Sequence, residues 1–323
     1  MSDPMQSEFV SLEQLVLQDH NYRKFLAAID FEKLCKPLKK IDNHGSAGAN
    51  GFGTLTLFKC LLLQFMEDIS DRELERFVQE NLAARYFCGF GITENTPDHT
   101  SFSKARQRIG TQRLSLLFKR MRDVLKQQGL MSEIFTFIDA SHLVAKAALW
   151  EERDQAIQAG HERFTNEVVH RFAADSQARF GSKGKNTFWF GYKKHVSVDM
   201  GSGFINKIAI TPANVSDAQG AQHVCPTQGA VYMDKGYCTK EVQRLMAARG
   251  CHERAIRKRN MKDKNRDRDR WISRLRSPYE GVFSQQRRRV RYRGVMKNQW
   301  SAFMEGLCYN MKRLIVMEKQ LSW

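Results

Sequence analysis

The stretch IFTFIDAS, residues 134–141, carries a single charged residue, Asp139, at the end of a short apolar run. A run of β-forming residues of this length predicts a buried strand. The stretch GAVYMDKGY, residues 229–237, repeats the arrangement with Asp234. A carboxylate is costly to bury inside a sheet, but at the C-terminal edge of the strands it reaches a crevice where ligands bind. We therefore expect two strands that each present an aspartate at such an edge.

The residues between and after these two stretches predict the rest of an α/β domain. Two alternating strands around a Gly-Ser-Gly turn are expected over 193–211, helices over 214–224 and 239–250, and another strand over 251–259. A basic helix that begins after Arg266 carries Glu280. The expected order is therefore β, ββ, α, β, α, β, α, which indicates a mixed sheet flanked by helices.

The first third of the chain is expected to be helical. Apolar residues repeat every three or four positions over 12–29. Ser70 and Glu73 have the spacing of a capping box, which predicts that a helix starts there. Thr96 and Pro97 match the cap and the first position of another helix.

The two helices on either side of CGFGITEN, residues 88–95, fit a helix-turn-helix. Its second helix would present Lys104, Arg106 and Arg108 to DNA. A helical bundle without DNA contacts fits the same pattern, so both interpretations stay open here.

The charge of the chain indicates a polyanionic partner. The 323 residues include 52 Lys and Arg against 35 Asp and Glu, which gives a net charge of +17. Residues 254–297 hold seventeen of the basic and four of the acidic residues, so 17 − 4 = +13 of this charge lies there. Nucleic acid is the simplest such partner, and a solvated basic face is the alternative.

The remaining composition argues for a reducing compartment and against a membrane. Seven scattered cysteines without a CxxC spacing fit free thiols better than disulfides or zinc sites. The apolar stretch 55–65 is too short to span a bilayer and contains Lys59. The N-terminus lacks the pattern of a signal peptide. We therefore expect a cytoplasmic, nucleoid-associated protein.

Asp139, Asp234 and Glu280 together predict a metal site. Three carboxylates brought close together repel one another unless a cation joins them, and Mg²⁺ prefers such oxygen ligands. We expect two Mg²⁺ ions, with Mn²⁺ as a substitute. Taken singly, each aspartate also fits a turn cap, and Glu280 also fits an ion pair with Arg276 or Arg287 within its helix.

Several other residues carry weaker signals. GSKGKN, residues 181–186, does not fit a nucleotide-binding P-loop, but Lys183 and Lys185 remain candidates for contacts to a DNA backbone. Asp199 and Asp217 fit turn and helix-cap roles better than a place among the site's acids. Trp189 fits a core position at least as well as stacking on a flipped base.

With these residues in hand, the chain resembles the bacterial insertion-sequence transposases of the DDE class. FIDAS and YMDKGY match the strands that carry the first and second aspartates of that family. The family's third acid lies in a signature of Tyr, two residues, Arg, three residues, Glu, six residues, and Lys or Arg. Arg276, Glu280 and Arg287 fit this signature, whereas Ser273 stands where the family has Tyr.

The resemblance implies an α/β fold with an RNase H-like mixed sheet, preceded by an all-helical region. Residues 1–130 would form a helical DNA-binding or dimerisation region. Residues 131–323 would form the catalytic domain, with an insertion around 146–187.

The resemblance also implies an activity and partners. A metal-activated water would cut a phosphodiester at the transposon end, and the freed 3′-OH would attack target DNA. Arg276 and Arg287 would contact DNA near the site, and we add Arg288 from the same arginine cluster. The DNA partners would be the terminal inverted repeats and the target, bound by a homodimer or a larger assembly. The rival interpretations are an RNase H-like nuclease without strand transfer and an inactive DNA-binding protein of the same fold.

Overall fold

The computed structural model describes residues 10–42, 51–184, 186–261, 264–284 and 287–322, without the side chains of Lys40, Asp42, Glu280, Phe283 and Ser284. The chain forms two compact units. One comprises the N-terminal part up to Val124 together with the residues from Leu307 onward, and the other comprises Leu125–Gly306. The expected domain boundary near residue 130 and the insertion around 146–187 stay predictions.

The first unit is helical, as expected. Its helices are α1 (Leu12–Leu15), α2 (Asn21–Ala28), α3 (Phe31–Leu34), α4 (Lys36–Asp42), α5 (Thr54–Met66), α6 (Asp71–Glu80), α7 (Leu82–Cys88), the greater part of α8 (His99–Gln127) and the end of α14 (Val295–Val316). Helix α5 is apolar on nearly all sides and is largely buried. Among the described residues no helix is both long and apolar enough to cross a membrane.

Two helix starts test the N-caps predicted from the sequence. The capping box before α6 is confirmed, because the Ser70 N–H donates to the Glu73 carboxylate at 2.7 Å and the Glu73 N–H donates to the Ser70 hydroxyl at 3.3 Å. The expectation of Thr96 as a cap is wrong. Helix α8 begins at His99, and the Asp98 carboxylate accepts the Ser101 N–H at 2.8 Å. An aspartate accepts this bond better than a threonine, so the chain caps there.

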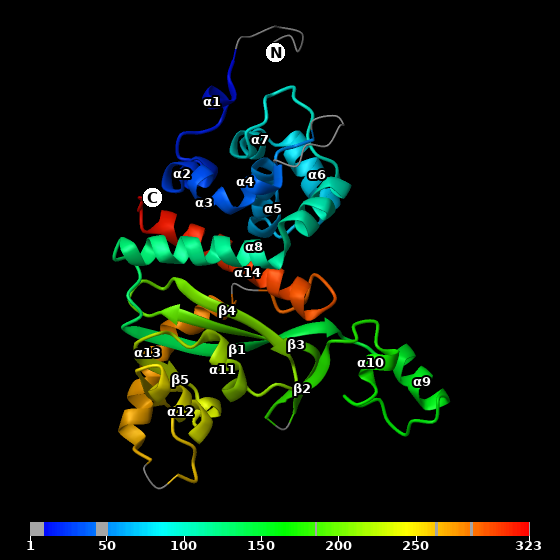
Figure 1. Ribbon diagram of the computed structural model, residues 1–323, viewed down its shortest axis with the longest axis vertical. Helices are drawn as coiled ribbons and strands as arrows, with labels where there is room; N and C mark the ends of the chain where they lie inside the picture. The colour runs from blue at the N-terminus through cyan, green and yellow to red at the C-terminus, as the bar shows by residue number, and fades with distance from the viewer. Residues whose placement is uncertain (1–9, 43–50, 185, 262–263, 285–286, 323) are drawn as a thin grey trace, which may run out of the picture. The chain divides into compact units, whose positions relative to one another are not determined.

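The second unit contains a mixed sheet (Figure 1). Its strands are β1 (Phe135–Lys146), β2 (Arg179–Lys183), β3 (Thr187–Asp199), β4 (Ile205–Pro212), β5 (Gly229–Met233) and β6 (Cys251–Ala255). Strands β4, β3 and β1 are antiparallel neighbours, whereas β1, β5 and β6 run parallel. The order β4-β3-β1-β5-β6 is that of an RNase H-like core, so the expected fold class is confirmed.

Strand β2 was not expected. It forms a hairpin with the first half of β3, so β3 begins at Thr187 rather than at Lys193. The two helices α9 (Trp150–Gln158) and α10 (Val169–Phe172) precede this hairpin and extend from the sheet beside it (Figure 1).

Helices cover both faces of the sheet. Ile138, Val231 and Met233 face a buried cluster that includes residues of α11 (Asp217–Val224) and α12 (Lys240–Ala248). Side chains alternate along a strand, so Phe137 and Tyr232 point to the opposite face. There they meet α13 (Arg266–Ser284), with ring centroids 6.2 Å apart for Phe137 and Tyr279 and 6.1 Å apart for Tyr232 and Trp271.

Two polar side chains of the first part of α14, those of Gln299 and Glu305, contact the sheet. The Gln299 amide oxygen accepts the Ile210 N–H at 2.8 Å, and its amide nitrogen donates to the Ile208 carbonyl at 3.2 Å. Gln299 therefore takes the place of a neighbouring strand along this part of β4. The buried ammonium of Lys194, on β3, pairs with Glu305. A charge buried this deeply is tolerated because it is paired.

Close packing of α11 on β3 leads to a first prediction. A Cβ at Gly220 would lie 2.1 Å from the buried ring of His195, whose Nε2 is 2.9 Å from the Thr211 hydroxyl. We expect Gly220→Ala to lower the free energy of unfolding by roughly 1–3 kcal/mol, because the ring must leave its place. Urea denaturation measures this change.

Gly201→Ala is the matched control, because its Cβ would make only an ordinary contact of 3.5 Å with the Asp199 carboxylate. Equal stability of the two variants would contradict the packing at Gly220.

Candidate active site

The two aspartates lie where two parallel strands separate. Strands β1 and β5 are paired only up to Ile138 and Met233, and the next residues along the chain are Asp139 and Asp234. Contrary to the sequence interpretation, β1 does not end at Asp139, because it continues beside β3 to Lys146. The expected edge is therefore the end of the β1–β5 pairing rather than the end of both strands.

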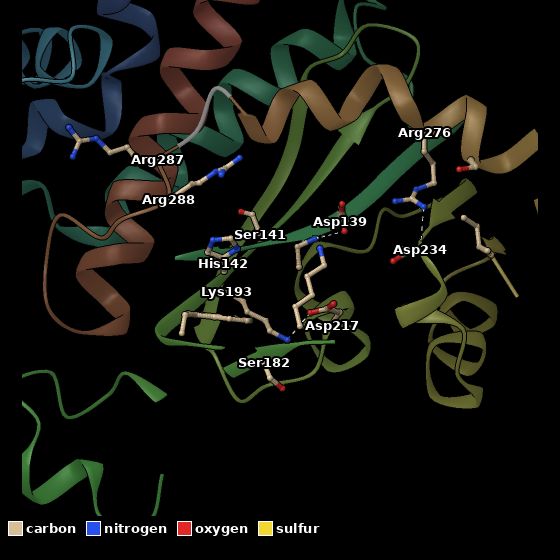
Figure 2. Close-up of a pocket in the computed structure, with 15 residues that line it drawn as sticks. Asp139, Ser141, His142, Ser182, Lys193, Asp217, Asp234, Arg276, Arg287 and Arg288 are labelled. Carbon is tan, nitrogen blue, oxygen red and sulfur yellow. Dashed lines mark hydrogen bonds and ion pairs between the residues drawn. The ribbon is translucent and has the colours of Figure 1, made fainter. Parts of the chain in front are cut away.

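Both aspartates line one cavity of about 560 Å³ (Figure 2). The other lining residues come from β1, β2, β3, α11, α13 and the segments after β6 and α13: Ala140, Ser141, His142, Ser182, Lys183, Trp189, Lys193, Asp217, Ile256, Ser273, Arg276, Arg287 and Arg288.

Asp139 is a carboxylate in a poorly solvated place. Burial raises its pKa to about 6, against the opposing effects of the Ala140 N–H and the charges of Arg276 and Lys183. The Ala140 N–H donates to the Asp139 carboxylate at 2.8 Å. Such a group gains free energy from a nearby cation, because a cation favours its charged form.

Asp234 is more exposed and has a cationic neighbour. Its side chain is 39% exposed, and its Oδ1 lies 3.5 Å from the Nη1 of Arg276 on α13. The Arg276 guanidinium also lies over the Phe137 ring, 5.3 Å from the centroid. Figure 2 shows Arg276 reaching toward Asp234 from the helix.

A second ion pair, between Lys193 and Asp217, also lines the cavity. Lys193, on β3, donates to the Asp217 carboxylate at 2.8 Å. Asp217 is the first residue of α11, which Ser216 caps. The sequence interpretation placed Asp217 at a helix start, as observed, but did not expect it in the cavity wall. Asp199, in contrast, has the expected turn role, because its carboxylate accepts bonds from the N–H groups of Glu133 and Ser202.

The basic residues expected to bind DNA have separate positions. Lys183, Arg287 and Arg288 line the cavity with Arg276. Lys104 and Arg108 are exposed on α8, in the helical unit. Their neighbour Arg106 instead pairs with Asp71 on α6. Lys185 lies outside the described residues.

Glu280 is on α13, one helical turn after Arg276, and its side chain lies outside the described residues. Among the described residues no group of three or more Asp, Glu, His and Cys side chains is arranged to hold a metal ion. Of the three predicted metal ligands, the structure describes the side chains of Asp139 and Asp234. Their hard oxygen donors fit Mg²⁺, and both side chains line the same cavity.

The sequence did not predict most of the neutral and aromatic residues that line the cavity. His142 and Trp189 face each other across β1 and β3 with ring centroids 5.5 Å apart, and Ser141 and Ser182 complete this side. The register that pairs His142 with Lys193 brings these residues together. Alternation within 193–211 signalled a strand, but nothing in the sequence gave its register against β1.

Comparison with known proteins identifies the family. A model of the transposase DDE domain matches residues 132–311, and a model of a transposase domain (DUF772) matches residues 10–108. The first match covers more than half of the chain and includes both aspartates.

The chain belongs to the DDE transposase family.

Individual relatives of this DDE transposase are distant. The chain is 26% identical over 223 residues to the transposase for insertion sequence element IS1106 of Neisseria meningitidis serogroup B, covering 61% of this chain and 77% of that protein. A piggyBac transposase synaptic complex with hairpin DNA aligns over 94% of this chain and 76% of its own, at 8% identity and a TM-score of 0.38. The Mos1 transposase paired-end complex aligns over 86% and 83%, at 8% identity and a TM-score of 0.18. Scores this low add nothing to the fold assignment.

The raised pKa of Asp139 leads to a prediction for the metal-free transposase. The folded state holds this proton more tightly than the unfolded chain, in which an aspartate has a pKa near 3.9. The stabilising effect of the protonated form is therefore fully present below about pH 4 and is lost as the pH rises through about 6. We expect Asp139→Asn to raise the free energy of unfolding at pH 8 in EDTA by roughly 1–3 kcal/mol, with little change at pH 4.

Asp199→Asn is the control with the opposite sign. The NH₂ of the new amide would face N–H groups that donate to the carboxylate in wild type. We therefore expect the free energy of unfolding to fall by roughly 1–3 kcal/mol at pH 8. Chemical denaturation at the two pH values measures both variants. A destabilised Asp139→Asn protein at pH 8 would contradict the burial of this carboxylate.

Proposed function

We propose that this DDE transposase cuts a phosphodiester bond at the ends of a transposon and joins the freed 3′-OH to target DNA. The observation that carries the proposal is the cavity in which Asp139 and Asp234 from neighbouring parallel strands meet a basic wall. Carboxylates alone would repel a DNA backbone, and the wall supplies the charge that attracts it.

We propose that Asp139, Asp234 and Glu280 hold divalent cations, two Mg²⁺ ions in the simplest case. Ions held there would supply activation of the attacking oxygen and stabilisation of the leaving one. Glu280 lies on helix α13. This helix packs on Phe137, next to the strands of the two aspartates. The position of Glu280 in the signature with Arg276 and Arg287 supports its assignment as the third acid.

The basic groups of the cavity would hold and orient the DNA. Arg287 and Arg288 follow α13, and Lys183 ends β2. Phosphate contacts of this kind fix the register of a duplex without reading its sequence. Lys193 also lines the cavity, and its ammonium group pairs with the Asp217 carboxylate. Lys185 is proposed as a further contact to the DNA backbone.

The helical region is proposed to bind the transposon ends and to support assembly. Lys104 and Arg108 are exposed on one helix, as DNA contacts require. The terminal inverted repeats and the target DNA would then be held by a dimer or a larger assembly. The match of a transposase domain to residues 10–108 supports a role for this region in transposition.

A nuclease that cuts without joining is the second candidate, because the same acids would serve it. An inactive DNA-binding protein is the third candidate. Cleavage and joining assays separate all three.

The decisive assay follows a labelled duplex that carries the element's ends, together with a supercoiled target, in Mg²⁺. We expect wild type to cut and to join, and Glu280→Gln, Asp139→Asn and Asp234→Asn each to lower cleavage by roughly 10³-fold or more, because each removes a metal-holding charge. Duplex binding should persist in all three variants.

Asp267→Asn is the matched control for Glu280→Gln. It removes a carboxylate from the same helix, and its side chain is 92% exposed. It should cut like wild type. Cutting without joining would favour the nuclease, and binding without cutting under any divalent metal would favour the inactive protein.

A further prediction concerns the helical region. We expect Lys104→Ala/Arg108→Ala to weaken binding to the end duplex and to lower the salt dependence of log K by about 1.8, since each phosphate contact contributes about 0.9. Fluorescence anisotropy at several KCl concentrations measures both quantities.

Lys24→Ala/Arg76→Ala removes the same charge from exposed positions of the same unit and serves as the control. If both double variants lose affinity equally, binding reflects net charge and not the proposed face of α8.

A further inference from the structure

Some of the arginines at the cavity lie on a short segment that is bonded to other parts of the second unit at both ends. We call residues 287–294 the arginine strap. Arg288, near its start, lines the cavity (Figure 2). At this end Val144, on β1, donates its N–H to the Arg288 carbonyl at 2.8 Å and accepts the Val290 N–H at 3.1 Å. The strap is therefore bonded to the same strand that carries Asp139.

The other end of the strap is the start of helix α14, which has no cap of its own. Gly294 precedes the helix, and it has no side chain that could accept the unpaired N–H groups of a helix start. Two side chains from the segment before β2 accept them instead. The Asp175 carboxylate accepts the Gly294 N–H at 3.2 Å from each oxygen, and the Gln177 amide oxygen accepts the Val295 N–H at 2.7 Å.

Asp175 is nearly buried and is surrounded by neutral donors. The residue is only 8% exposed. Its carboxylate also accepts the Tyr192 hydroxyl at 2.7 Å and the Gln177 N–H at 3.3 Å. None of the donors that the structure describes around it is a basic side chain. A buried carboxylate is costly unless donors satisfy it, so Asp175 and the Gly294 N–H stabilise each other's position.

The composition of the strap explains why it needs bonds at both ends. Its five arginines lie within seven residues: Arg287, Arg288, Arg289, Arg291 and Arg293. Like charges this close repel one another and favour an open, mobile segment. A mobile segment loses conformational entropy when it binds a ligand, whereas a segment that is already ordered binds more tightly.

We infer that Asp175, assisted by Gln177, is a positioning residue for DNA binding. It fixes the end of the arginine strap, so that the arginines meet the DNA backbone in a preset arrangement. Asp175 is not among the residues that line the cavity, and its charge would repel DNA, so it favours binding only through the strap. The inference rests on the proposed DNA contact of Arg288.

Hydrogen exchange without DNA tests whether Asp175 fixes the strap. Exchange is followed by mass spectrometry for wild type, Asp175→Ala and Asp154→Ala. Asp154 is the matched control, because it is an acid of α9 with a side chain that is 56% exposed. Asp175→Ala should speed exchange several-fold in peptides over 287–294 and leave those of β5 and β6 unchanged. Asp154→Ala should match wild type throughout. Unchanged exchange of the strap in Asp175→Ala would overturn the inference.

Gln177→Ala covers the case in which Asp175→Ala does not fold. Gln177 is exposed, and its amide oxygen accepts the Val295 N–H, so its loss loosens the same end of the strap without leaving the Tyr192 hydroxyl unpaired. Faster exchange over 287–294 in this variant supports the inference. Exchange equal to wild type contradicts it.

The sign of the change in DNA affinity tests the consequence. Binding of the end duplex is measured by anisotropy in EDTA at several KCl concentrations. Asp175→Ala removes a negative charge, so charge alone predicts equal or tighter binding, as for Asp154→Ala. The inference predicts several-fold weaker binding with the wild-type salt slope, because all arginines remain but have to be ordered on binding. Equal or tighter binding by Asp175→Ala would therefore exclude a positioning role.

Arg288→Gln separates the inference from the proposed function. It should bind the duplex more weakly and lower the slope of log K against log salt concentration by about 0.9, the value for one phosphate contact. If it binds like wild type, the proposed contact of Arg288 is wrong and the effect of Asp175 on DNA fails with it, while hydrogen exchange still shows whether Asp175 fixes the strap. If it binds more weakly, the contact stands, and the Asp175→Ala affinity alone decides the inference.

Discussion

The site depends on the short parallel pairing of β1 with β5. The pairing stops after Ile138 and Met233, and the chain places an aspartate at the next position of each strand. One strand then continues beside β3, while the other turns into the short helix η1 (Lys235–Tyr237). The opening between the two strands forms because their pairing ends at Ile138 and Met233, and no inserted loop is required.

The packing around this opening explains why it keeps its shape. Ile138, Val231 and Met233 are fully buried on one face, and Phe137 meets α13 on the other. A one-residue slip in register would exchange these two faces, which makes the register costly to change. The aspartates are therefore positioned by apolar side chains next to them in the chain, and Asp234 is also held by its ion pair with Arg276.

The order of elements and the positions of both aspartates could be predicted from the sequence. A short apolar run that ends in a single charged residue is typical of a buried strand. The continuation of β1 past Asp139 could not, because HLVAK has no clear alternation and gains its strand structure from pairing with β3. The residues that line the cavity could not be predicted from the sequence either. Lys193 and Asp217 are 24 positions apart and meet only when α11 packs on β3. The burial of Arg276 was also missed, since a sequence of arginines does not show which one faces Phe137.

Gln299 sets a limit on how copies of this protein associate. Its side-chain amide occupies the donor of Ile210 and the acceptor of Ile208, where a strand from another chain would otherwise bind. Strand addition at an open sheet edge is a common route to dimers and to aggregates. This stretch of β4 is closed to that route, so any assembly of this transposase would use side-chain surfaces or DNA instead of extending the sheet there.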